Sequence, residues 1–253
     1  MSVVDQSPRE GLIWSGATGA RLRQWPNDPR CAHLILTGSY DRVELPGPDV
    51  LLGWQRTARE WGYLSMRTSA LPTPVADSLA AVGFATVQHL VLLSAAHGDR
   101  TSFDMPRDAT PRAVLRRSLT TGSSTTGAIL SVDSSAFDRP WQLDEGAFHD
   151  ALRATATARV FVSRRDRRID GFVLAGVTER TGFIQRLAVH PASRRSGTAT
   201  RLVARALEWT EKKRCTTTVV NTETSNHAAL GLYRSLGFRE HTDSLVVMEC
   251  DLT

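Results

Sequence analysis

The feature that most constrains this 253-residue sequence is a short turn, Arg194-Arg195-Ser196-Gly197-Thr198-Ala199, between two regular segments. Phe183–Val189 is typical of a strand, and Thr198–Lys213 is typical of an amphipathic helix. Gly197 lets the backbone approach a ligand closely, and the free N–H groups at a helix start attract phosphate. Glycine and arginine also occur in strand-to-helix turns that bind nothing, so the turn alone is weak evidence for an anion site.

The rest of the C-terminal half alternates short strands and helices. The pattern predicts helices over Asp144–Thr155 and Asn226–Leu236, and strands over Arg159–Ser163, Ile169–Val177, Thr216–Val220 and Leu245–Met248, with a hairpin turn at Arg165–Arg167. Thr120–Gly127 has the composition of a flexible loop. The polar stretch His97–Pro111 contains two prolines and separates two apolar regions. We therefore predict two domains, residues 1–105 and 106–253.

Two motifs in the second domain resemble the GNAT acetyltransferase superfamily. Its phosphate-binding signature, Arg or Gln followed by x, x, Gly, x and Gly or Ala, is matched by Arg194, Gly197 and Ala199. Its later motif is matched by Asn226, Ala228, Ala229, Leu232, Tyr233, Leu236, Gly237 and Phe238. The resemblance covers Arg112–Thr253 and implies an α/β GNAT fold, with a mixed, mostly antiparallel sheet flanked by helices.

The resemblance also implies acetyl-CoA as cosubstrate. The expected binding residues are Leu187, Ala188 and Val189 for pantetheine, with Arg194, Arg195, Ser196, Gly197, Thr198, Ala199, Thr200, Asn226, Ala229 and Tyr233. The N–H of Val189 would stabilise the oxyanion that forms when an amine attacks the thioester. Tyr233 would be the general acid that protonates the departing thiolate. The alternative is that Tyr233 packs in a helix face with its hydroxyl satisfied elsewhere.

The general base and the acceptor side are less well defined. Relatives that acetylate protein N-termini often carry a glutamate where this chain has Asn221, which cannot take a proton. Glu223 would lie on the same face of a continuing strand and is the predicted substitute; a solvated turn residue is the alternative. Phe137 and Trp141 are predicted acceptor-side residues, because a similar Pro-Trp occurs in ribosomal-protein N-terminal acetyltransferases. Gln185 is the third, because it stands in a strand region where some relatives carry an acid. The alternative for the aromatic pair is ordinary core packing.

Charge and composition exclude some classes of protein. The net charge is +5, but only two of the 31 Lys and Arg residues are lysines, which is typical of a GC-rich coding bias. Net charge alone bears on nonspecific binding, so a nucleic-acid partner is not predicted. His190 has no second ligand at a telling spacing, so no metal is predicted. No membrane span or signal segment is evident, and we predict a cytoplasmic protein. The oligomeric state stays open.

The N-terminal region contains a faint repeat of the C-terminal one. Ala58-Arg59-Glu60-Trp61 parallels Ala206-Leu207-Glu208-Trp209, each predicted to end a helix. The repeat continues with a strand at Leu64–Thr68, a helix at Pro74–Val82, Gly83-Phe84 matching Gly237-Phe238, and a strand at Leu90–Leu93. We therefore predict a smaller, degenerate GNAT-like N-terminal module, as in tandem GNAT proteins.

The cofactor elements are missing from this predicted module. Leu45–Asp49 takes the place of the phosphate turn, where two prolines remove N–H donors and Asp49 would repel phosphate. Leu79 stands where Tyr233 does, and Pro72 stands where Asn226 does. We predict that the module binds no acetyl-CoA, packs against the catalytic domain and forms a wall of the acceptor cleft.

Three functions are compatible with these observations. The leading hypothesis is an N-acetyltransferase that transfers an acetyl group from acetyl-CoA to a primary amine of a protein or small molecule. The second is a noncatalytic acetyl-CoA-binding sensor or scaffold protein, suggested by the asparagine in place of the strand glutamate. The third is an arginine-rich nucleic-acid-binding module.

Overall fold

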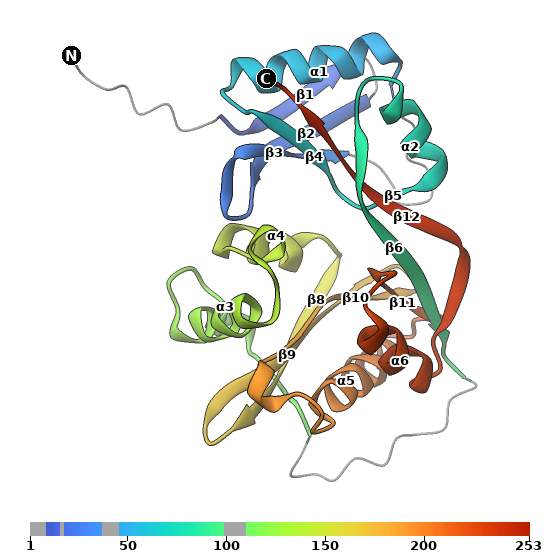
Figure 1. Ribbon diagram of the computed structural model, residues 1–253. Coiled ribbons are helices and arrows are strands. Elements are labelled where there is room, and N and C mark those ends of the chain that lie inside the picture. The colour runs from blue at the N-terminus through green and yellow to red at the C-terminus, as the bar shows by residue number, and fades with distance from the viewer. Residues whose placement is uncertain (1–8, 16–17, 37–45, 99–109) are drawn as a thin grey trace, which may run out of the picture. The chain divides into compact units, whose positions relative to one another are not determined.

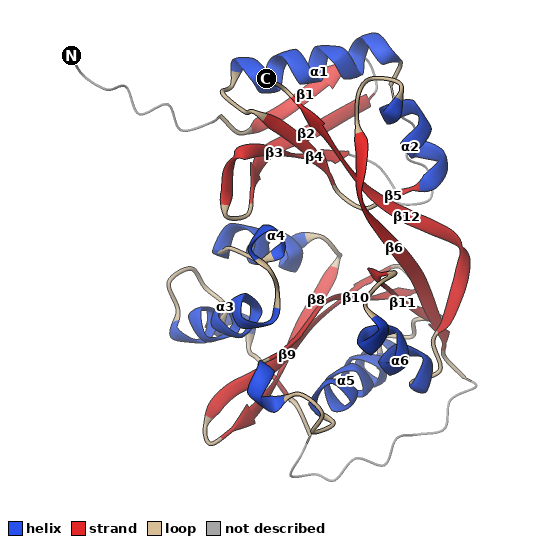
Figure 2. Ribbon diagram, in the orientation of Figure 1, coloured by secondary structure: helices blue, strands red, loops and turns tan. Residues whose placement is uncertain are grey.

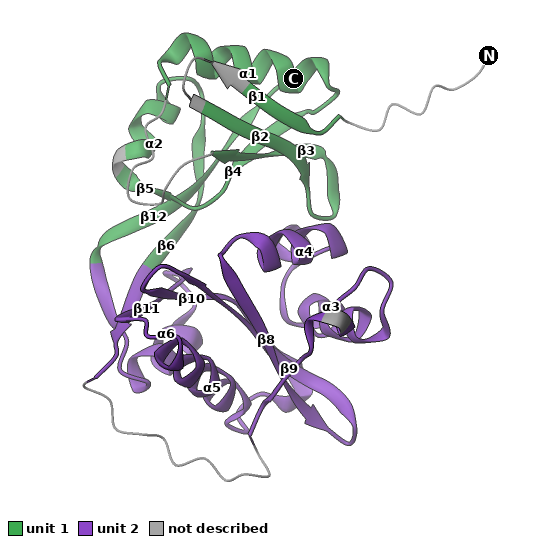
Figure 3. Ribbon diagram, turned by 180° about the vertical axis from the view of Figure 1, so that it is seen from behind, with its two compact units in different colours: residues 1–91, 242–253 green, residues 92–241 purple. Residues whose placement is uncertain are grey.

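The computed structural model describes residues 9–15, 18–36, 46–98 and 110–253 (Figure 1). The chain divides into unit 1, which comprises residues 1–91 and 242–253, and unit 2, which comprises residues 92–241 (Figure 3). The predicted domain boundary between residues 105 and 106 lies outside the described residues. The two units differ from the predicted domains, because residues 242–253 belong to unit 1.

Unit 1 contains a mixed sheet and two helices. Its elements are β1 (Gly11–Ser15), β2 (Thr18–Trp25), β3 (Asp28–Leu36), α1 (Pro48–Glu60), β4 (Ser65–Thr68), β5 (Leu71–Pro72), α2 (Thr73–Ala80), and most of β6 (Ala85–Ala96) and β12 (Arg239–Asp251). The strand order is β1-β2-β3-β4-β12-β6. β1, β2 and β3 are antiparallel, whereas β3 and β4 are parallel.

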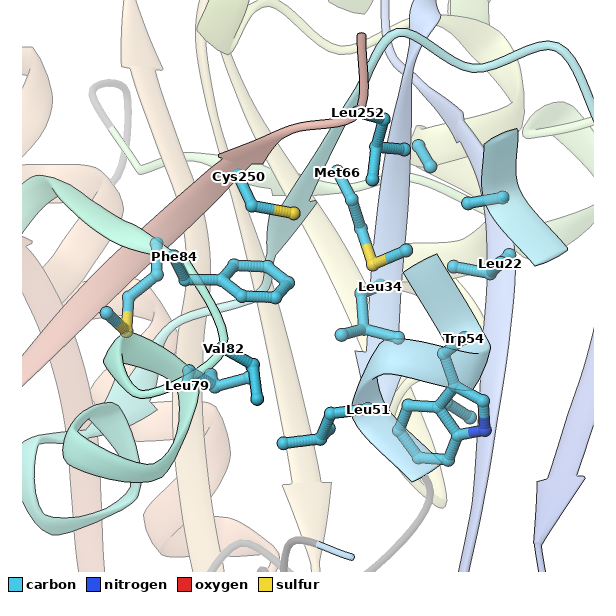
Figure 4. Close-up of a cluster of buried hydrophobic side chains, with 14 of the residues drawn as sticks. Leu22, Leu34, Leu51, Trp54, Met66, Leu79, Val82, Phe84, Cys250 and Leu252 are labelled. Carbon is cyan, nitrogen blue, oxygen red and sulfur yellow. The ribbon is translucent and has the colours of Figure 1, made fainter. Parts of the chain in front are cut away.

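The core of unit 1 lies between the sheet and the two helices (Figure 4). Leu51, Trp54 and Ala58 of α1 are buried, and their i, i+3, i+7 spacing places them on one helix face. They pack with Leu34 of β3 and Leu79 of α2 in a single apolar cluster. An amphipathic helix of this kind is stabilised mainly by the face that it buries.

Unit 2 is a mostly antiparallel sheet flanked by helices (Figure 2). Its elements are β7 (Arg112–Ala113), α3 (Ser124–Ala136), α4 (Glu145–Arg153), β8 (Thr157–Arg165), β9 (Arg168–Thr178), β10 (Thr181–Val189), α5 (Thr198–Lys212), β11 (Thr217–Glu223) and α6 (His227–Ser235). The strand order is β11-β10-β9-β8-β7, and only β10 and β11 are parallel. Side chains of α3 and α4 share one core cluster with β8, β9 and β10.

Most helices and strands predicted for the C-terminal half are confirmed. Helices α4, α5 and α6 and strands β8 to β11 lie within a few residues of the predicted ranges. The hairpin turn is also confirmed, since Asp166 and Arg167 both have positive φ, +50° and +65°. The final strand is much longer than predicted, because β12 runs from Arg239 to Asp251. None of the helices in the described ranges is long and apolar enough to cross a membrane.

The flexible loop predicted over Thr120–Gly127 is wrong in its second half. Helix α3 starts at Ser124, and the Ser123 side chain caps it by accepting the Thr126 N–H at 3.1 Å. The Thr126 side chain is fully buried. Serine and threonine are common both in loops and at helix N-caps, and composition alone does not separate the two.

The two halves of the chain repeat the same order of elements, as the faint sequence repeat predicted. Three antiparallel strands are followed by a helix, a parallel strand, a second helix and a last strand, in β1 to β6 and again in β8 to β12. Helices α2 and α6 even end in the same way. Phe84 N–H donates to Leu79 O at 3.1 Å, and Phe238 N–H donates to Tyr233 O at 3.0 Å. The predicted equivalence of Leu79 and Tyr233 is therefore confirmed.

The predicted pairing of Trp61 with Trp209 is wrong. Trp61 follows the last residue of α1, but Trp209 lies inside α5, which continues to Lys212. The equivalent of Trp61 is Lys213, since both N–H groups bond to the carbonyl four residues back and both precede a residue with positive φ. The error is four residues, about one helical turn, which leaves the pattern of apolar positions nearly unchanged.

The last strands of the two repeats are exchanged. β12, the last strand of the second repeat, pairs in unit 1, and the end of β6, the last strand of the first repeat, lies in unit 2. In unit 1, Cys250 of β12 is the register partner of Met66 in β4. In unit 2, His97 N–H, just after β6, donates to Thr216 O at 2.9 Å beside β11. The hydroxyl of Thr217 donates to Ala95 O at 3.2 Å. Each repeat therefore completes the sheet of the other unit.

Candidate functional site

A gap opens between the two parallel strands of unit 2. β10 pairs with β11 only over Thr181–Phe183. The register between β10 and β9 then shifts between Ile184 and Arg186, so Gln185 is the extra residue of a β-bulge, which bends the strand. Residues 187–189 stay paired with β9 but have no pairing with β11. Along this edge, backbone N–H and C=O groups can bind an amide-containing ligand.

A cavity of about 820 Å³ lies at this gap. It is lined by Ala136, Phe137, Leu187, Ala188, Val189, Ser193, Arg194, Arg195, Gly197, Thr198, Ala199, Thr200, Asn226, His227, Ala228, Ala229, Gly231, Leu232 and Ser235. The structure thus brings together all the residues predicted to bind the cofactor except Ser196 and Tyr233. Phe137 is the one predicted acceptor-side residue that lines it.

The start of α5 has the geometry of an anion site. Gly197 is the N-cap residue, with φ +75° and without a side-chain cap, so the first N–H groups of the helix remain available. Arg201, in the first turn of α5, holds this turn in place. Its Nη1 donates to Ser196 O at 3.0 Å, and its Nη2 donates to Thr198 Oγ1 at 3.1 Å.

The start of α6 differs from that of α5. The Asn226 side chain accepts the Ala229 N–H at 3.1 Å and so caps the helix. In contrast, the Ser196 hydroxyl does not cap α5; it donates to Ser193 O at 2.7 Å and lies 2.9 Å from Thr198 Oγ1. Of the two helix ends at the cavity, the one that is free to bind phosphate is that of α5.

Tyr233 lies on α6 among residues that line the cavity but is not itself a lining residue. Its side chain is buried, and its ring packs against Phe238 with a centroid distance of 5.4 Å. Burial raises the pKa of the Tyr233 phenol above its usual value. A phenol is protonated at neutral pH even without this shift, so the Tyr233 hydroxyl carries the proton that a donor needs, and the shift extends that state to higher pH.

Two of the predicted acceptor-side residues, Phe137 and Trp141, contact a buried ion pair that sequence reasoning missed. Arg186 Nε and Nη2 donate to the two carboxylate oxygens of Asp133 at 2.7 and 2.9 Å. Nη2 also donates to Trp141 O at 2.7 Å, and the guanidinium lies 3.5 Å from the centre of the Phe137 ring. Asp133 further accepts the Leu143 N–H at 2.8 Å. The pair thus connects β10, α3 and the segment that follows α3.

The other predicted catalytic and acceptor-side residues lie outside the cavity lining. Glu223 is the last residue of β11 and accepts the Ser225 hydroxyl at 3.3 Å, whereas Asn221 is exposed. Gln185 donates from Nε2 to Ala151 O at 3.0 Å, which ties the bulge to α4. His190 accepts the Ala192 N–H through Nδ1 at 3.2 Å, a local capping contact.

Comparison with known proteins agrees with this geometry. The model of the acetyltransferase (GNAT) family matches residues 128–238. A segment of 63 residues, 25% of this chain, is 38% identical to an aminoglycoside N(6′)-acetyltransferase type 1 from Acinetobacter haemolyticus. The match spans 43% of that protein's length. Residues 128–238 are therefore similar to the acetyltransferase (GNAT) family.

Solved structures resemble the chain over nearly its whole length. A GCN5-related N-acetyltransferase from Kribbella flavida aligns with a TM-score of 0.64 at 14% identity, covering 97% of this chain and 91% of that one. A tandem GNAT protein from the clavulanic acid biosynthesis pathway aligns with a TM-score of 0.67 at 13% identity, covering 97% and 84%. At such low identity these likenesses bear on the fold, which extends to the N-terminal repeat.

Proposed function

We propose that the protein is an N-acetyltransferase that transfers the acetyl group of acetyl-CoA to a primary amine. The observation that carries this proposal is the cavity that joins the open edge of β10 to the uncapped start of α5. An amide-containing pantetheine chain suits the strand edge, and a pyrophosphate suits the helix start. The GNAT match and the aminoglycoside acetyltransferase relative support the same chemistry.

In the proposed reaction, a neutral amine attacks the thioester carbonyl and forms a tetrahedral oxyanion. The Val189 N–H, on the open edge of β10, is the proposed donor to that oxyanion. The C–S bond then breaks, and the Tyr233 hydroxyl protonates the departing thiolate. The amine's own proton goes to solvent, or to Glu223 through a water. The amine becomes an amide, and coenzyme A leaves as the thiol.

Replacing the proposed proton donor gives a direct test. We expect Tyr233→Phe to lower kcat by about 100-fold, the lower end of the usual contribution of a general acid. Binding of acetyl-CoA should change little, because the phenylalanine keeps the ring that packs against Phe238 and loses only the hydroxyl. The measurement is thiol release with a panel of amines, beginning with aminoglycosides, lysine peptides and peptide N-termini.

Tyr63→Phe is the matched control, because Tyr63 is also buried but lies in unit 1. Its hydroxyl donates to Arg9 O at 3.0 Å, so the change removes one local hydrogen bond in unit 1. Wild-type turnover by Tyr233→Phe would remove the residue from the mechanism.

The pH dependence of the wild-type protein gives a further check on Tyr233. The turnover rate should not fall up to about pH 10, since the raised pKa keeps the Tyr233 phenol neutral there.

A second prediction concerns unit 1, which we propose does not bind acetyl-CoA. There β3 pairs with β4 over all four residues of β4, and Ser69 N–H still donates to Leu34 O, so no gap opens. Helix α1, which connects β3 to β4, begins with Pro48, which lacks an N–H, and carries Asp49 in its first turn. Calorimetry should therefore give one acetyl-CoA per chain. Two equivalent sites per chain would contradict this assignment.

One observation favours a noncatalytic acetyl-CoA-binding protein as the second candidate. None of the residues that line the cavity is an aspartate or glutamate, and Asn221 cannot act as a base. A sensor of this kind would bind acetyl-CoA with the same stoichiometry but release no thiol with any amine in the panel. Binding and turnover measured on the same sample therefore separate the two functions.

A further inference from the structure

The tip of the β8–β9 hairpin carries a concentrated positive charge that the acetyl-transfer site does not use. Arg164, Arg165, Arg167 and Arg168 are all exposed, with Asp166 as the one acidic residue among them. No carboxylate of the described part of the chain lies within salt-bridge distance of these four arginines. The hairpin projects from the sheet of unit 2 (Figure 1), and its tip is not part of the cavity lining.

The arginines at this tip destabilise the hairpin locally. Arg165 and Arg168 are register partners in the antiparallel pair, and like charges directly opposite each other destabilise a sheet. Arg167 has φ +65°, in the left-handed region where a two-residue hairpin turn favours glycine. Neither choice helps the hairpin to fold. A partner that neutralises the arginines would remove the first of these costs.

The chemistry of the tip points to one kind of partner. From Arg164 to Arg168 it has no apolar or aromatic side chain, so it lacks the buried anchors on which protein interfaces depend. Binding to a phosphate backbone needs only charge and hydrogen-bond donors, and arginine supplies both. A two-stranded ribbon is also narrow enough to enter the major groove of a duplex. We propose that this hairpin tip binds the phosphate backbone of duplex nucleic acid without sequence preference.

The test is the binding of a fluorescently labelled DNA duplex of about 20 base pairs, followed by anisotropy across salt concentrations. Saturating acetyl-CoA is present, so that phosphate binding at the start of α5 does not contribute. The variant combines Arg165→Gln, Arg167→Gln and Arg168→Gln. The matched control combines Lys212→Gln, Lys213→Gln and Arg214→Gln, which removes the same charge from exposed residues at the far end of α5.

We expect the tip variant to bind the duplex at least ~10-fold more weakly at low salt. The slope of log affinity against log salt should become shallower by roughly 3, about 0.9 for each lost phosphate contact. The control variant should bind within about twofold of wild type. The tip variant should also unfold at an equal or higher temperature, because the Arg165–Arg168 repulsion is gone.

Two outcomes would overturn the proposal. One is equal weakening by the tip and control variants, which would mean that net charge alone drives binding. The other is displacement of the duplex by a poly-glutamate peptide at lower concentration than by unlabelled duplex, which would indicate an acidic protein partner. Neither outcome depends on acetyl transfer, so the proposal stands or falls separately from the proposed function.

Discussion

Gly197→Glu is expected to abolish acetyl-CoA binding, with Kd rising by at least ~100-fold, about 2.7 kcal/mol. The new Cβ would lie 3.0 Å from Arg201 Nη1, a side chain that fixes the turn. The carboxylate would then stand at the start of α5, where the proposed pyrophosphate binds, and repel it. Titration calorimetry with acetyl-CoA measures the effect.

Backbone strain must be separated from loss of the site, because Gly197 has φ +75° and any side chain is strained there. Gly62→Glu is the matched control. Gly62 has φ +91°, nothing lies within 4 Å of a Cβ built on it, and it belongs to unit 1. It should lower stability by about 1 kcal/mol and leave the Kd unchanged. If Gly197→Glu bound acetyl-CoA like the wild type, the proposed phosphate site would be wrong.

The second large effect is expected from Asp133→Ala, which should lower the free energy of unfolding by roughly 3–5 kcal/mol. Asp133 is fully buried, and its loss leaves the Arg186 guanidinium, 17% exposed, without its counterion. The Leu143 N–H would also lose its acceptor. Urea denaturation followed by circular dichroism measures the change.

An ion pair whose arginine is largely exposed provides the control for Asp133→Ala. Asp150→Ala removes the partner of Arg153, which is 63% exposed, and should cost less than about 0.5 kcal/mol. Replacing the buried pair together, with Asp133→Leu and Arg186→Met, should recover most of the lost stability, since no buried charge is left unpaired. Equal costs for the two single alanine variants would show that the buried pair contributes no more than the Asp150–Arg153 pair.

How far the fold could be predicted depended on the local pattern. Amphipathic α5 and the Leu-Tyr-x-x-Leu-Gly-Phe motif of α6 carry strong periodicity and caps, and both helices were found within two residues. Strands β1, β2 and β3 were missed, because residues 11–36 show no clear alternation and their pairing is set by tertiary contacts. The start of α3 was missed, because a capping serine and a loop serine look alike in a sequence.

The candidate site also has parts that the sequence predicts and parts that it does not. The proposed phosphate turn is built from consecutive residues, so its parts could be read in order from Arg194 to Thr200. The bulge at Gln185 and the Arg186–Asp133 pair join residues that are far apart in the chain. An arginine within the apolar run Phe183–Val189, and an aspartate beside Ile129 and Val132, were the available signals. Each charged residue needs a partner when buried, but the sequence does not say which.

The exchange of last strands gives the N-terminal half, which we propose has no cofactor site of its own, a structural reason to persist. β6 supplies the residues that bond beside β11, while β12 pairs with β4. Substitutions that erased a phosphate turn from the first half would leave this donated strand intact. Natural selection on the first half would then act on its backbone geometry, leaving its ligand-binding residues free to drift.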